Sequence, residues 1–373
     1  MKIALVVPGG VDRSGEIRVI PAILALIRKL SSAHEVHVFA LRQEPLQGSW
    51  SLAGASIHNV GTRATVWRTF TMIRAEHRRG AFDVLHSIWS GKCGLLAVSC
   101  AKLLRVPSLV HIAGGELVCI PEISYGGQCG CLSRMREVAV LRATRAVTAA
   151  SAPILEMLKK LGIAAQRVPL GVDLDLWPPL DPQRRSLADP IRLIHVASLN
   201  RVKDQSTLLR AIAIVAQRGH AFHLDVIGED TLDGAIQSLS AALGLSSRVH
   251  FHGFLRQTEL RPLMGAAHLL LVSSRHEAGP VAMLEAAVMG VPTVGTRVGH
   301  LAEWSPEAAI AVTIGDAEGL AQAIIDLSCD EDQRLKLATE AQMRAVHDDA
   351  DFCARQFSAL YKTVSDLGPP SAR

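Results

Sequence analysis

Residues 269–289 read LLLVSSRHEAGPVAMLEAAVM, and this stretch decides the fold. Four apolar residues end at a pair of serines, as a short buried strand does where a loop begins. Gly279 lets a ligand approach the backbone, and Pro280 suits the first turn of a following helix. A strand, loop and helix in this order are the repeating unit of a parallel α/β sheet, and the free N–H groups of such a helix favour an anion.

Strand-like runs alternate with helical stretches on both sides of this segment, which predicts two doubly wound, Rossmann-like α/β domains. The expected strands are residues 3–7, 35–40, 84–86, 108–112 and 146–148, then 191–197, 223–227, 248–251, 269–272 and 293–295. The expected helices include residues 18–30, 95–104, 206–217, 232–243 and 281–289. A proline-rich linker at 176–182 separates the two series. We expect domains at 1–170 and 171–350, followed by an amphipathic helix and tail at 351–373.

Composition excludes disordered, collagen-like and coiled-coil classes, because 49% of the 373 residues are apolar and 20% are charged. The charge is unevenly spread. Residues 1–170 carry 21 Lys and Arg against 10 Asp and Glu, for a net charge of +11, and the remainder of the chain carries −7. The basic half is suited to an anionic partner, such as a phospholipid surface, a lipid phosphate or an acidic sugar, or it is simply a solvated basic face. Nucleic acid is not expected, because aromatic residues that stack on bases are few.

Seven scattered cysteines form an odd set, unlike the dense framework of a small secreted protein. We therefore expect free thiols, no structural zinc and a cytoplasmic location. The first apolar run is too short for a signal peptide, and no apolar stretch reaches the length that spans a bilayer. Any membrane contact is expected to be peripheral. A basic helix with Trp67, Phe70, Met72 and Ile73 among arginines either lies on an anionic membrane or, as we favour, turns its aromatic side to the core.

The loop and helix of the opening stretch carry two glutamates eight residues apart. Glu277 precedes the helix, where it could reach a sugar, and Glu285 lies about a turn and a half inside, where a carboxylate accepts ribose hydroxyl groups. A diphosphate would lie between them, at the amino end of the helix. The predicted contacts to this sugar, diphosphate and ribose are Glu277, Ala278, Gly279, Pro280, Val281 and Glu285.

Other predicted contacts to the same ligand lie in loops that follow other strands. Lys203 comes after strand 191–197, and its charge would stabilise a leaving diphosphate. Ser198 and Arg201 share its loop, where Arg201 is either a phosphate ligand or an exposed cation. Gly9 and Gly10 follow the first strand, as a phosphate-binding loop or a plain tight turn. Phe254 is the last of the predicted contacts to this ligand.

These motifs together resemble the retaining glycosyltransferases of family 4 type, which have the GT-B fold. The E-x7-E pattern is followed by Gly290-Val291-Pro292, by Gly299-His300-Leu301-Ala302-Glu303, and is preceded by Gly171-Val172-Asp173 and Gly228-Glu229-Asp230. The resemblance implies two domains facing across a cleft and a C-terminal helix that crosses back to the N-terminal domain. This chain departs from the family pattern at Leu170, at Ser198 in place of an arginine, and at His300 in place of a glycine.

The resemblance also implies the roles of the site residues. The donor is expected to be a UDP- or GDP-sugar with no further cofactor, and the expected catalytic residues are Glu277, Lys203 and His111. The family usually has a histidine where this chain has Ala113, so His111, two residues earlier on the same strand face, either takes part of that role or belongs to the core; His86 is a similar case. We expect no catalytic metal, since Asp173 and Asp175 suit turn or capping roles near the linker.

The sequence therefore predicts a retaining glycosyltransferase that acts on a glycan, lipid-linked or small-molecule acceptor in bacterial-type cell-surface polysaccharide or glycolipid biosynthesis. Two alternatives remain: a GT-B nucleotide-sugar epimerase, and a catalytically impaired subunit that needs a partner chain. The donor's base and sugar, the acceptor and the oligomeric state are not encoded in motifs of this kind.

Overall fold

The computed structural model describes residues 1–366 and divides the chain into two compact units. The first unit holds Met1–Asp173 together with the chain from Asp348 on, and the second holds Leu174–His347. The division comes after Asp173, because this buried carboxylate pairs with Arg28 and Lys29 of the first unit. Of the predicted C-terminal segment 351–373, residues 367–373 lie outside the described part. No helix among residues 1–366 is long and apolar enough to cross a membrane.

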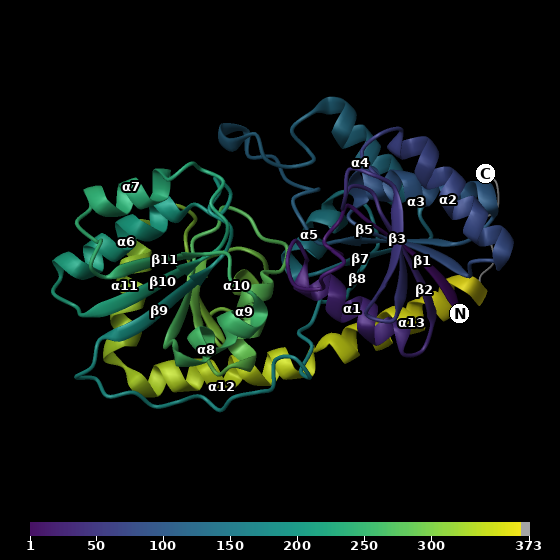
Figure 1. Ribbon diagram of the computed structural model, residues 1–373. Helices are drawn as coiled ribbons and strands as arrows, with labels where there is room; N and C mark the ends of the chain where they lie inside the picture. The colour runs from purple at the N-terminus through teal and green to yellow at the C-terminus, as the bar shows by residue number, and fades with distance from the viewer. Residues whose placement is uncertain (367–373) are drawn as a thin grey trace. The chain divides into compact units, whose positions relative to one another are not determined.

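The first unit is an α/β layered domain around an eight-stranded sheet of order β3-β4-β2-β1-β5-β6-β7-β8 (Figure 1). Its strands are β1 (Lys2–Val7), β2 (Glu35–Ala40), β3 (Gly48–Leu52), β4 (Ala55–Asn59), β5 (Val84–Ile88), β6 (Ser108–Ile112), β7 (Ala146–Ala149) and β8 (Gln166–Arg167). Its helices are α1 (Pro21–Ser31), α2 (Thr65–Arg79), the π-helical turn η1 (Ser90–Gly94), α3 (Leu95–Leu104), the 3₁₀ turn η2 (Pro121–Ile123), α4 (Cys131–Ala143), α5 (Ala152–Lys160) and α13 (Ala350–Asp366).

Strand alternation divides this unit's core between the two faces of the sheet. Ile3, Leu5 and Val7 of β1 pack with α1 and α13, whereas Ala4 and Val6 pack with α2 and α3. The sequence analysis missed β3 and β4, an antiparallel pair turned at Ala53 and Gly54. The half-exposed β3 carries only a weak apolar pattern, so its pairing comes from the neighbouring strand.

The C-terminal helix α13 belongs to the first unit, as the resemblance implied. It packs against α1, and it buries Phe357 and Tyr361 completely. His34 lies between α1 and β2, and its Nε2 is hydrogen-bonded to Ser358 Oγ of α13 at 2.9 Å. The prediction that the last helix returns to the N-terminal domain is confirmed.

The second unit contains a six-stranded parallel sheet of order β11-β10-β9-β12-β13-β14. Its strands are β9 (Ile191–Val196), β10 (Phe222–Ile227), β11 (Val249–Gly253), β12 (Leu269–Val272), β13 (Thr293–Thr296) and β14 (Ala309–Val312). Its helices are α6 (Gln205–Gln217), α7 (Ala235–Ala242), α8 (Gln257–Ala266), α9 (Val281–Val288), α10 (Gly299–Trp304), α11 (Ala317–Cys329) and α12 (Glu331–His347).

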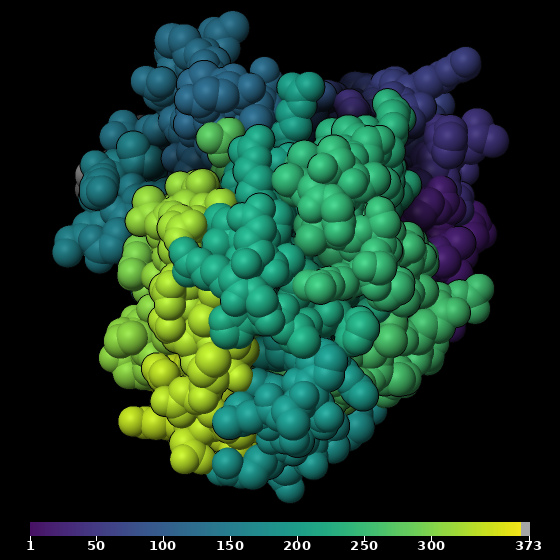
Figure 2. Space-filling model, turned by 90° about the vertical axis from the view of Figure 1, so that its left-hand side faces the viewer, coloured from purple at the N-terminus to yellow at the C-terminus, as the bar shows by residue number. Residues whose placement is uncertain are grey.

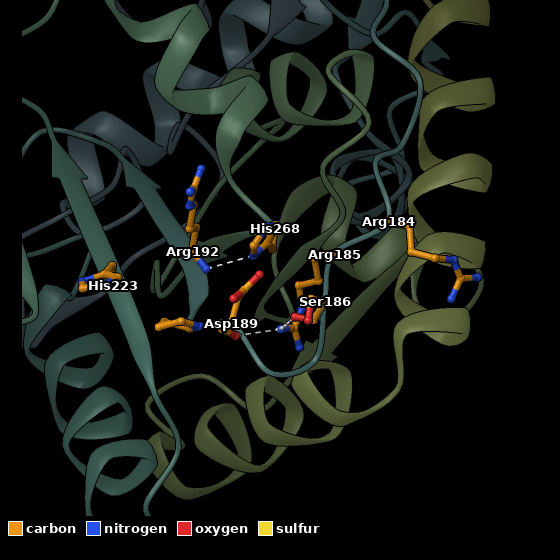
Figure 3. Close-up of a pocket in the computed structure, with 8 residues that line it drawn as sticks. Arg184, Arg185, Ser186, Asp189, Arg192, His223 and His268 are labelled. Atoms are coloured by element: carbon orange, nitrogen blue, oxygen red, sulfur yellow. Dashed lines mark hydrogen bonds between the residues drawn. The ribbon is translucent and has the colours of Figure 1, made fainter.

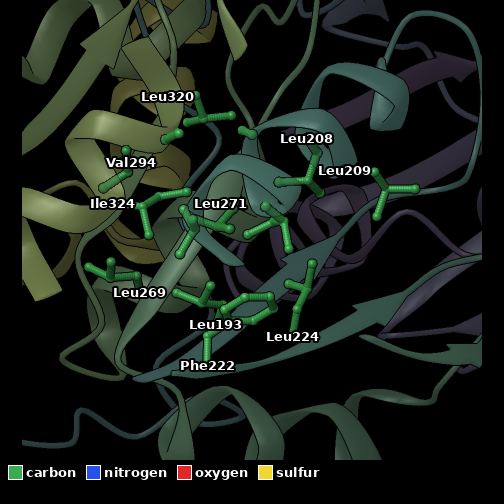
Figure 4. Close-up of a cluster of buried hydrophobic side chains, with 14 of the residues drawn as sticks. Leu193, Leu208, Leu209, Phe222, Leu224, Leu269, Leu271, Val294, Leu320 and Ile324 are labelled. Atoms are coloured by element: carbon green, nitrogen blue, oxygen red, sulfur yellow. The ribbon is translucent and has the colours of Figure 1, made fainter. Parts of the chain in front are cut away.

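Apolar side chains from strands and helices interlock in the core of this unit. Leu193, Leu224 and Leu271 of three strands meet Leu208 of α6 and Ile324 of α11 (Figure 4). Helices α6 and α11 lie side by side on one face of the sheet, and their teal and yellow-green atoms adjoin on the surface (Figure 2). Helix α11 also packs on β13 and β14, so these two helices cover neighbouring parts of the sheet.

Two expectations about side chains are corrected by the structure. Trp67, expected on the core side of its helix, is 71% exposed, while Ile73 is fully buried. Cys119 and Cys129 form a disulfide, so the expectation of free thiols is wrong for this pair. The antiparallel bridge between Ile120 and Tyr125 turns the chain back on itself and brings the two Cα atoms to 4.8 Å.

Candidate donor-binding site

The order of strands in the second unit places two loops side by side. The chain proceeds from β9 to β10 and β11 in one direction, and from β12 to β13 and β14 in the other. Strands β9 and β12 are neighbours, so the loops after them diverge from a topological switch point. Ligands of open α/β sheets bind at the carboxyl ends of the strands at such a point. Lys203 lies in the first of these loops and Glu277 in the second.

Lys203 and Glu277 are joined by an ion pair, with 2.5 Å between Nζ and Oε1. The same Oε1 accepts a hydrogen bond from Ser274 Oγ at 2.6 Å. Both charged side chains are partly exposed, at 25% for Lys203 and 13% for Glu277. The structure thus brings together two residues that the sequence analysis assigned to different parts of the donor. Ser274 was missed, because a serine in a loop carries no signal of its own.

Backbone contacts fasten the two loops to each other. Ser273 Oγ donates to the carbonyl of Lys203 at 2.8 Å, and the N–H of Arg275 donates to the carbonyl of Val202 at 2.8 Å. On the other side, Asn200 Oδ1 accepts from the N–H of Lys203 at 3.1 Å. The position of Lys203 is therefore set by hydrogen bonds rather than by its ion pair alone.

The amino end of α9 adjoins Glu277. Pro280 is its N-cap, and no side chain among residues 1–366 caps it by a hydrogen bond. The unpaired N–H groups of such a turn, with the helix dipole, favour an anion. Gly299 packs against this loop: a Cβ at its position would lie 3.1 Å from both the Glu277 carbonyl and Pro280 Cδ. Its φ of +46° is also in the left-handed region. Both the close packing and the backbone conformation therefore favour glycine at this position.

Glu285 lies in the middle of α9 and is 5% exposed. Burial raises the pKa of its carboxyl to about 7, because removal from water disfavours the charged form. Its one hydrogen bond in the described part of the chain is long, 3.4 Å from Gln257 Nε2. The carboxylate thus has acceptor capacity to spare for hydroxyl donors.

Three further predicted donor contacts, Ser198, Arg201 and Phe254, lie on the surface of the second unit. Ser198, Arg201 and Phe254 are exposed, and Phe254 presents 52% of its surface to solvent. The Ser198 carbonyl accepts from Gln205 Nε2 at 3.1 Å, which fixes the loop backbone. Among residues 1–366, no hydrogen bond or ion pair joins the side chains of these three residues to Lys203 or Glu277.

Gly9 and Gly10 follow β1, at the switch point between β1 and β5 of the first unit. The N–H groups of Gly10 and Val11 both donate to Gln43 Oε1, at 2.7 and 2.9 Å. They are therefore not free in this structure, and a phosphate could use them only after Gln43 moved. Gln43 lies just beyond β2, and nothing in its sequence context pointed to this contact.

His111 and His86 lie in the core of the first unit, beneath α13. Both are fully buried, and both rings contact Phe357. His86 Nδ1 bonds the Tyr361 hydroxyl at 2.7 Å, and His111 Nδ1 bonds Thr148 Oγ1 at 2.9 Å. Burial lowers the pKa of His111 to about 3, so its ring is neutral. Of the two roles left open for His111, the structure favours the one in the core.

A buried acidic group that the sequence analysis did not select lies after β5 and β6. Ser90 bonds both carboxylates: its N–H lies 3.4 Å from Glu116 Oε1, and its Oγ donates to Glu137 Oε2. Glu116 Oε2 is buried with no hydrogen-bond partner among residues 1–366. Burial raises the pKa of Glu116 to about 7. The adjoining Trp89 has a φ of +73°, and strained backbone of this kind gathers at functional sites.

A pocket of about 500 Å³ lies at the amino ends of β9 and β10, whereas the switch-point loops follow the carboxyl ends of β9 and β12. Figure 3 shows Arg192, His223 and His268 around it, with Arg184 directed away. Arg184 pairs with Asp332 at 2.6 Å, and Arg185 is bound to backbone carbonyls. The N–H of Arg185 also donates to Glu331 Oε1 at 2.8 Å, so Arg184 and Arg185 are both tied to the start of α12. The residues that line the pocket include neither Lys203 nor Glu277.

Comparison with known proteins agrees with this arrangement. A model described as "Glycosyltransferase Family 4" matches residues 22–176, and one described as "Glycosyl transferases group 1" matches residues 190–330. The chain belongs to the glycosyltransferases of family 4 type. The two matches fall in the two units in turn, so each unit is a recognised part of a family member.

Curated relatives of this glycosyltransferase family match part of the chain. The lipopolysaccharide core biosynthesis glycosyltransferase LpsE of Rhizobium meliloti is 32% identical over 42% of this chain and 45% of its own length. The "MMP alpha-(1->4)-mannosyltransferase" of Mycolicibacterium hassiacum is 27% identical over 75% of this chain and 70% of its own length. The chain thus spans about half of the first relative and more of the second.

Solved structures show the same GT-B fold over nearly the whole chain. Sucrose-phosphate synthase of Thermosynechococcus elongatus has a TM-score of 0.81 at 20% identity, covering 99% of this chain and 100% of its own. Anabaena HepE, solved in complex with UDP and glucose, has a TM-score of 0.74 at 18% identity, covering 97% and 100%. The predicted fold class is confirmed.

Proposed function

We propose that this chain is a retaining glycosyltransferase that uses a nucleotide-diphosphate sugar. The observation that carries the proposal is the Lys203–Glu277 pair at the switch point of the second unit, next to the uncapped amino end of α9. A cation, a free helix end and a carboxylate are what a diphosphate and a sugar hydroxyl require. The nucleotide complex of the structural neighbour HepE supports UDP as the first donor to test.

In this proposal the resting ion pair separates when the donor binds. Lys203 and the N–H groups of α9 hold the diphosphate, while Glu277, still bonded to Ser274, accepts hydroxyl groups of the sugar. Glu285 accepts the ribose hydroxyls. The charge that grows on the leaving diphosphate is stabilised by Lys203 and the helix dipole, without need for a metal ion.

The reaction step proposed is a substitution on one face of the sugar. The bond from the anomeric carbon to the diphosphate oxygen breaks, the acceptor oxygen bonds that carbon from the same side, and the acceptor proton passes to the leaving phosphate. This step needs no protein nucleophile, in keeping with the neutral, buried His111. Positioning and charge stabilisation supply the catalysis.

The acceptor is proposed to be a glycan, lipid-linked or small-molecule hydroxyl compound of bacterial-type surface polysaccharide or glycolipid synthesis. The named role of LpsE in lipopolysaccharide core biosynthesis supports this class. An exposed apolar and basic face of the first unit supports a peripheral contact with an anionic membrane. Helices α2, α3 and α4 pack side by side there, with exposed Val66, Trp67, Leu103, Leu132 and Met135.

One observation favours a second candidate function, that of a nucleotide-binding subunit with little activity of its own. Ala113 stands where the family usually has a histidine, and His111 is enclosed in the core instead of replacing it. Such a subunit would bind nucleotide as the first proposal requires, and would turn over only when its partner chain is added.

Calorimetric titration of UDP, GDP and ADP tests the donor site. We expect one nucleotide to bind in the presence or absence of EDTA, and binding to weaken at least tenfold in Lys203→Ala and Glu285→Ala. Equal binding by the two variants and the parent would place the donor elsewhere. A screen of the corresponding nucleotide sugars, with and without acceptors, then separates the two functions: release of nucleotide that depends on an acceptor supports the transferase.

A further inference from the structure

Two histidines and a glutamate from three elements of the first unit meet away from the loops described above. His37 lies on β2, His58 on β4 and Glu76 on α2. One possible ligand atom from each lies within 4.8 Å of the others. His37 Nδ1 and His58 Nε2 are 3.0 Å apart, and the planes of the two rings are nearly parallel, at 4°. The two side chains are 7% and 9% exposed, so the cluster lies under the surface.

The sheet register brings the two histidines together. Phe39 pairs directly with His58 across β2 and β4, and His37, two residues before Phe39, points to the same face. This is the face covered by α2, which buries Ile73 against Phe39 and Phe82. Glu76 follows Ile73 by three residues, so it lies on the same side of the helix.

His37 is oriented as histidine ligands of metals are. Its Nε2 bonds Glu35 Oε1 at 2.9 Å, and Lys2 holds Glu35 from the other side at 3.2 Å. A carboxylate that accepts the proton of one ring nitrogen leaves the lone pair on the other, and this arrangement is common behind metal ligands. The free lone pair of His37 is on Nδ1, the atom that faces His58.

The two ring nitrogens of His58 face different partners: Nε2 faces His37 Nδ1 at 3.0 Å, and Nδ1 faces Ser49 Oγ at 3.5 Å. With His37 protonated on Nε2, the proton between the rings belongs to His58 Nε2. A cation at this nitrogen requires that proton to move to Nδ1, where Ser49 Oγ lies 3.5 Å away to accept it. The exchange moves the proton between the two nitrogens of one ring, so it releases no proton.

Glu76 supplies the negative charge of the cluster. Its Oε1 is paired with Arg79 Nη1 at 2.5 Å, but the Arg79 side chain is 73% exposed. The Glu76 side chain is only 13% exposed, but the cation of the pair lies in water, which weakens the attraction, so a divalent ion bound by both histidines can displace it.

We propose that His37, His58 and Glu76 bind one divalent transition-metal ion, with Zn²⁺ as the expected occupant, and that the ion fastens α2 to β2 and β4. Two imidazoles and one carboxylate match the ligand preferences of Zn²⁺, whereas Mg²⁺ and Ca²⁺ prefer oxygen ligands throughout. The role is structural, so it does not depend on the proposed transfer. The sequence predicted no metal, because these three residues lie on separate elements and form no ligand pattern along the chain.

The test is a titration of the full-length protein, without an affinity tag and after removal of metals by chelator. Co²⁺ serves as the coloured probe, and Zn²⁺ as the competitor. We expect one Co²⁺ per chain, with visible absorption, no thiolate-to-cobalt band and displacement by Zn²⁺. Zn²⁺ should also raise the thermal unfolding midpoint. A thiolate band would assign the ion to the cysteines, and no visible band would mean no site; either result overturns the proposal.

Matched variants identify the ligands. His58→Gln and Glu76→Gln should weaken Co²⁺ binding at least tenfold, and Glu35→Gln should weaken it by a smaller factor through the orientation of His37. His223→Gln, a change at an exposed histidine of the second unit, should bind as the parent does. Glu76 is partly exposed, and its variant should unfold at the parent's midpoint in the absence of metal. Parent-like affinity in both His58→Gln and Glu76→Gln would overturn the assignment.

Discussion

Lys203 Nζ lies 2.5 Å from Glu277 Oε1, across two loops that leave neighbouring strands of one sheet. The pair is only partly exposed, and Ser274 Oγ donates to the same carboxylate oxygen of the glutamate. The two residues are 74 positions apart in the chain. Their contact gives the candidate site a resting state in which each charge is already neutralised.

Neutralising Glu277 should separate nucleotide binding from sugar transfer. In Glu277→Gln, Lys203 remains free to contact the diphosphate, so nucleotide affinity should stay within about threefold of the parent or rise. The transfer rate should fall by about 100-fold, since a charge-assisted hydrogen bond to the sugar contributes roughly 1.5–3 kcal/mol. Calorimetry and a nucleotide-release assay measure the two effects. A loss of nucleotide affinity matching that of Lys203→Ala would contradict separate roles.

Glu285 should make stability depend on pH. Its pKa is raised to about 7 in the folded chain. Between about pH 4.5 and 7 the unfolded chain loses this proton first, so the group's contribution to the free energy of unfolding decreases as pH rises and levels off above pH 7. Glu285→Gln should therefore match the parent near pH 4 and exceed it at pH 8 by up to about 3 kcal/mol.

Urea unfolding of parent and Glu285→Gln at the two pH values measures this difference. The pKa of Glu116 is raised as well, but Glu116 is present in both proteins, so its contribution to the free energy of unfolding cancels in the comparison. A difference that is the same at pH 4 and pH 8 would show that Glu285 is ionised in the folded chain.

Changing His111 should affect stability more than catalysis. His111→Ala opens a cavity under Phe357 and leaves Thr148 without its partner, at a cost of about 2–4 kcal/mol. The kcat of the folded protein should remain within about threefold. Thermal unfolding and a rate assay below the midpoint measure both. A drop of 100-fold in kcat with parent-like substrate binding and stability would return His111 to the catalytic residues.

Trp67 should contribute to binding of anionic vesicles. Trp67→Ala should weaken sedimentation with phosphatidylglycerol vesicles by about tenfold, since an exposed tryptophan and surrounding arginines suit the interfacial region. Met343→Ala, which changes an exposed apolar residue of the second unit, is the matched control and should bind as the parent does. Equal loss in both variants, or binding to neutral phosphatidylcholine alone, would argue against this face.

The pattern of apolar runs was sufficient to predict most strands. Strands that are buried on both faces, such as Ile3–Val7 and Leu269–Val272, give short continuous apolar runs followed by loop residues. The strands that were not predicted, β3, β4, β8 and β14, have two to five residues each, and the side chains of β3 are exposed or half-buried. Their place in the sheet depends on the neighbour they pair with, and this information is not local.

The sequence by itself determined the strand–loop–helix unit around Glu277, the glycine and proline positions of its turn, and the family to which these belong. These are local properties, set by backbone sterics and by residue spacing along one helix. Only the tertiary structure decided that Lys203 neutralises Glu277, that Gln43 occupies the Gly10 loop, and that His111 faces Phe357. Each of these contacts joins distant segments, because strand order and packing, rather than spacing in the chain, determine which side chains meet.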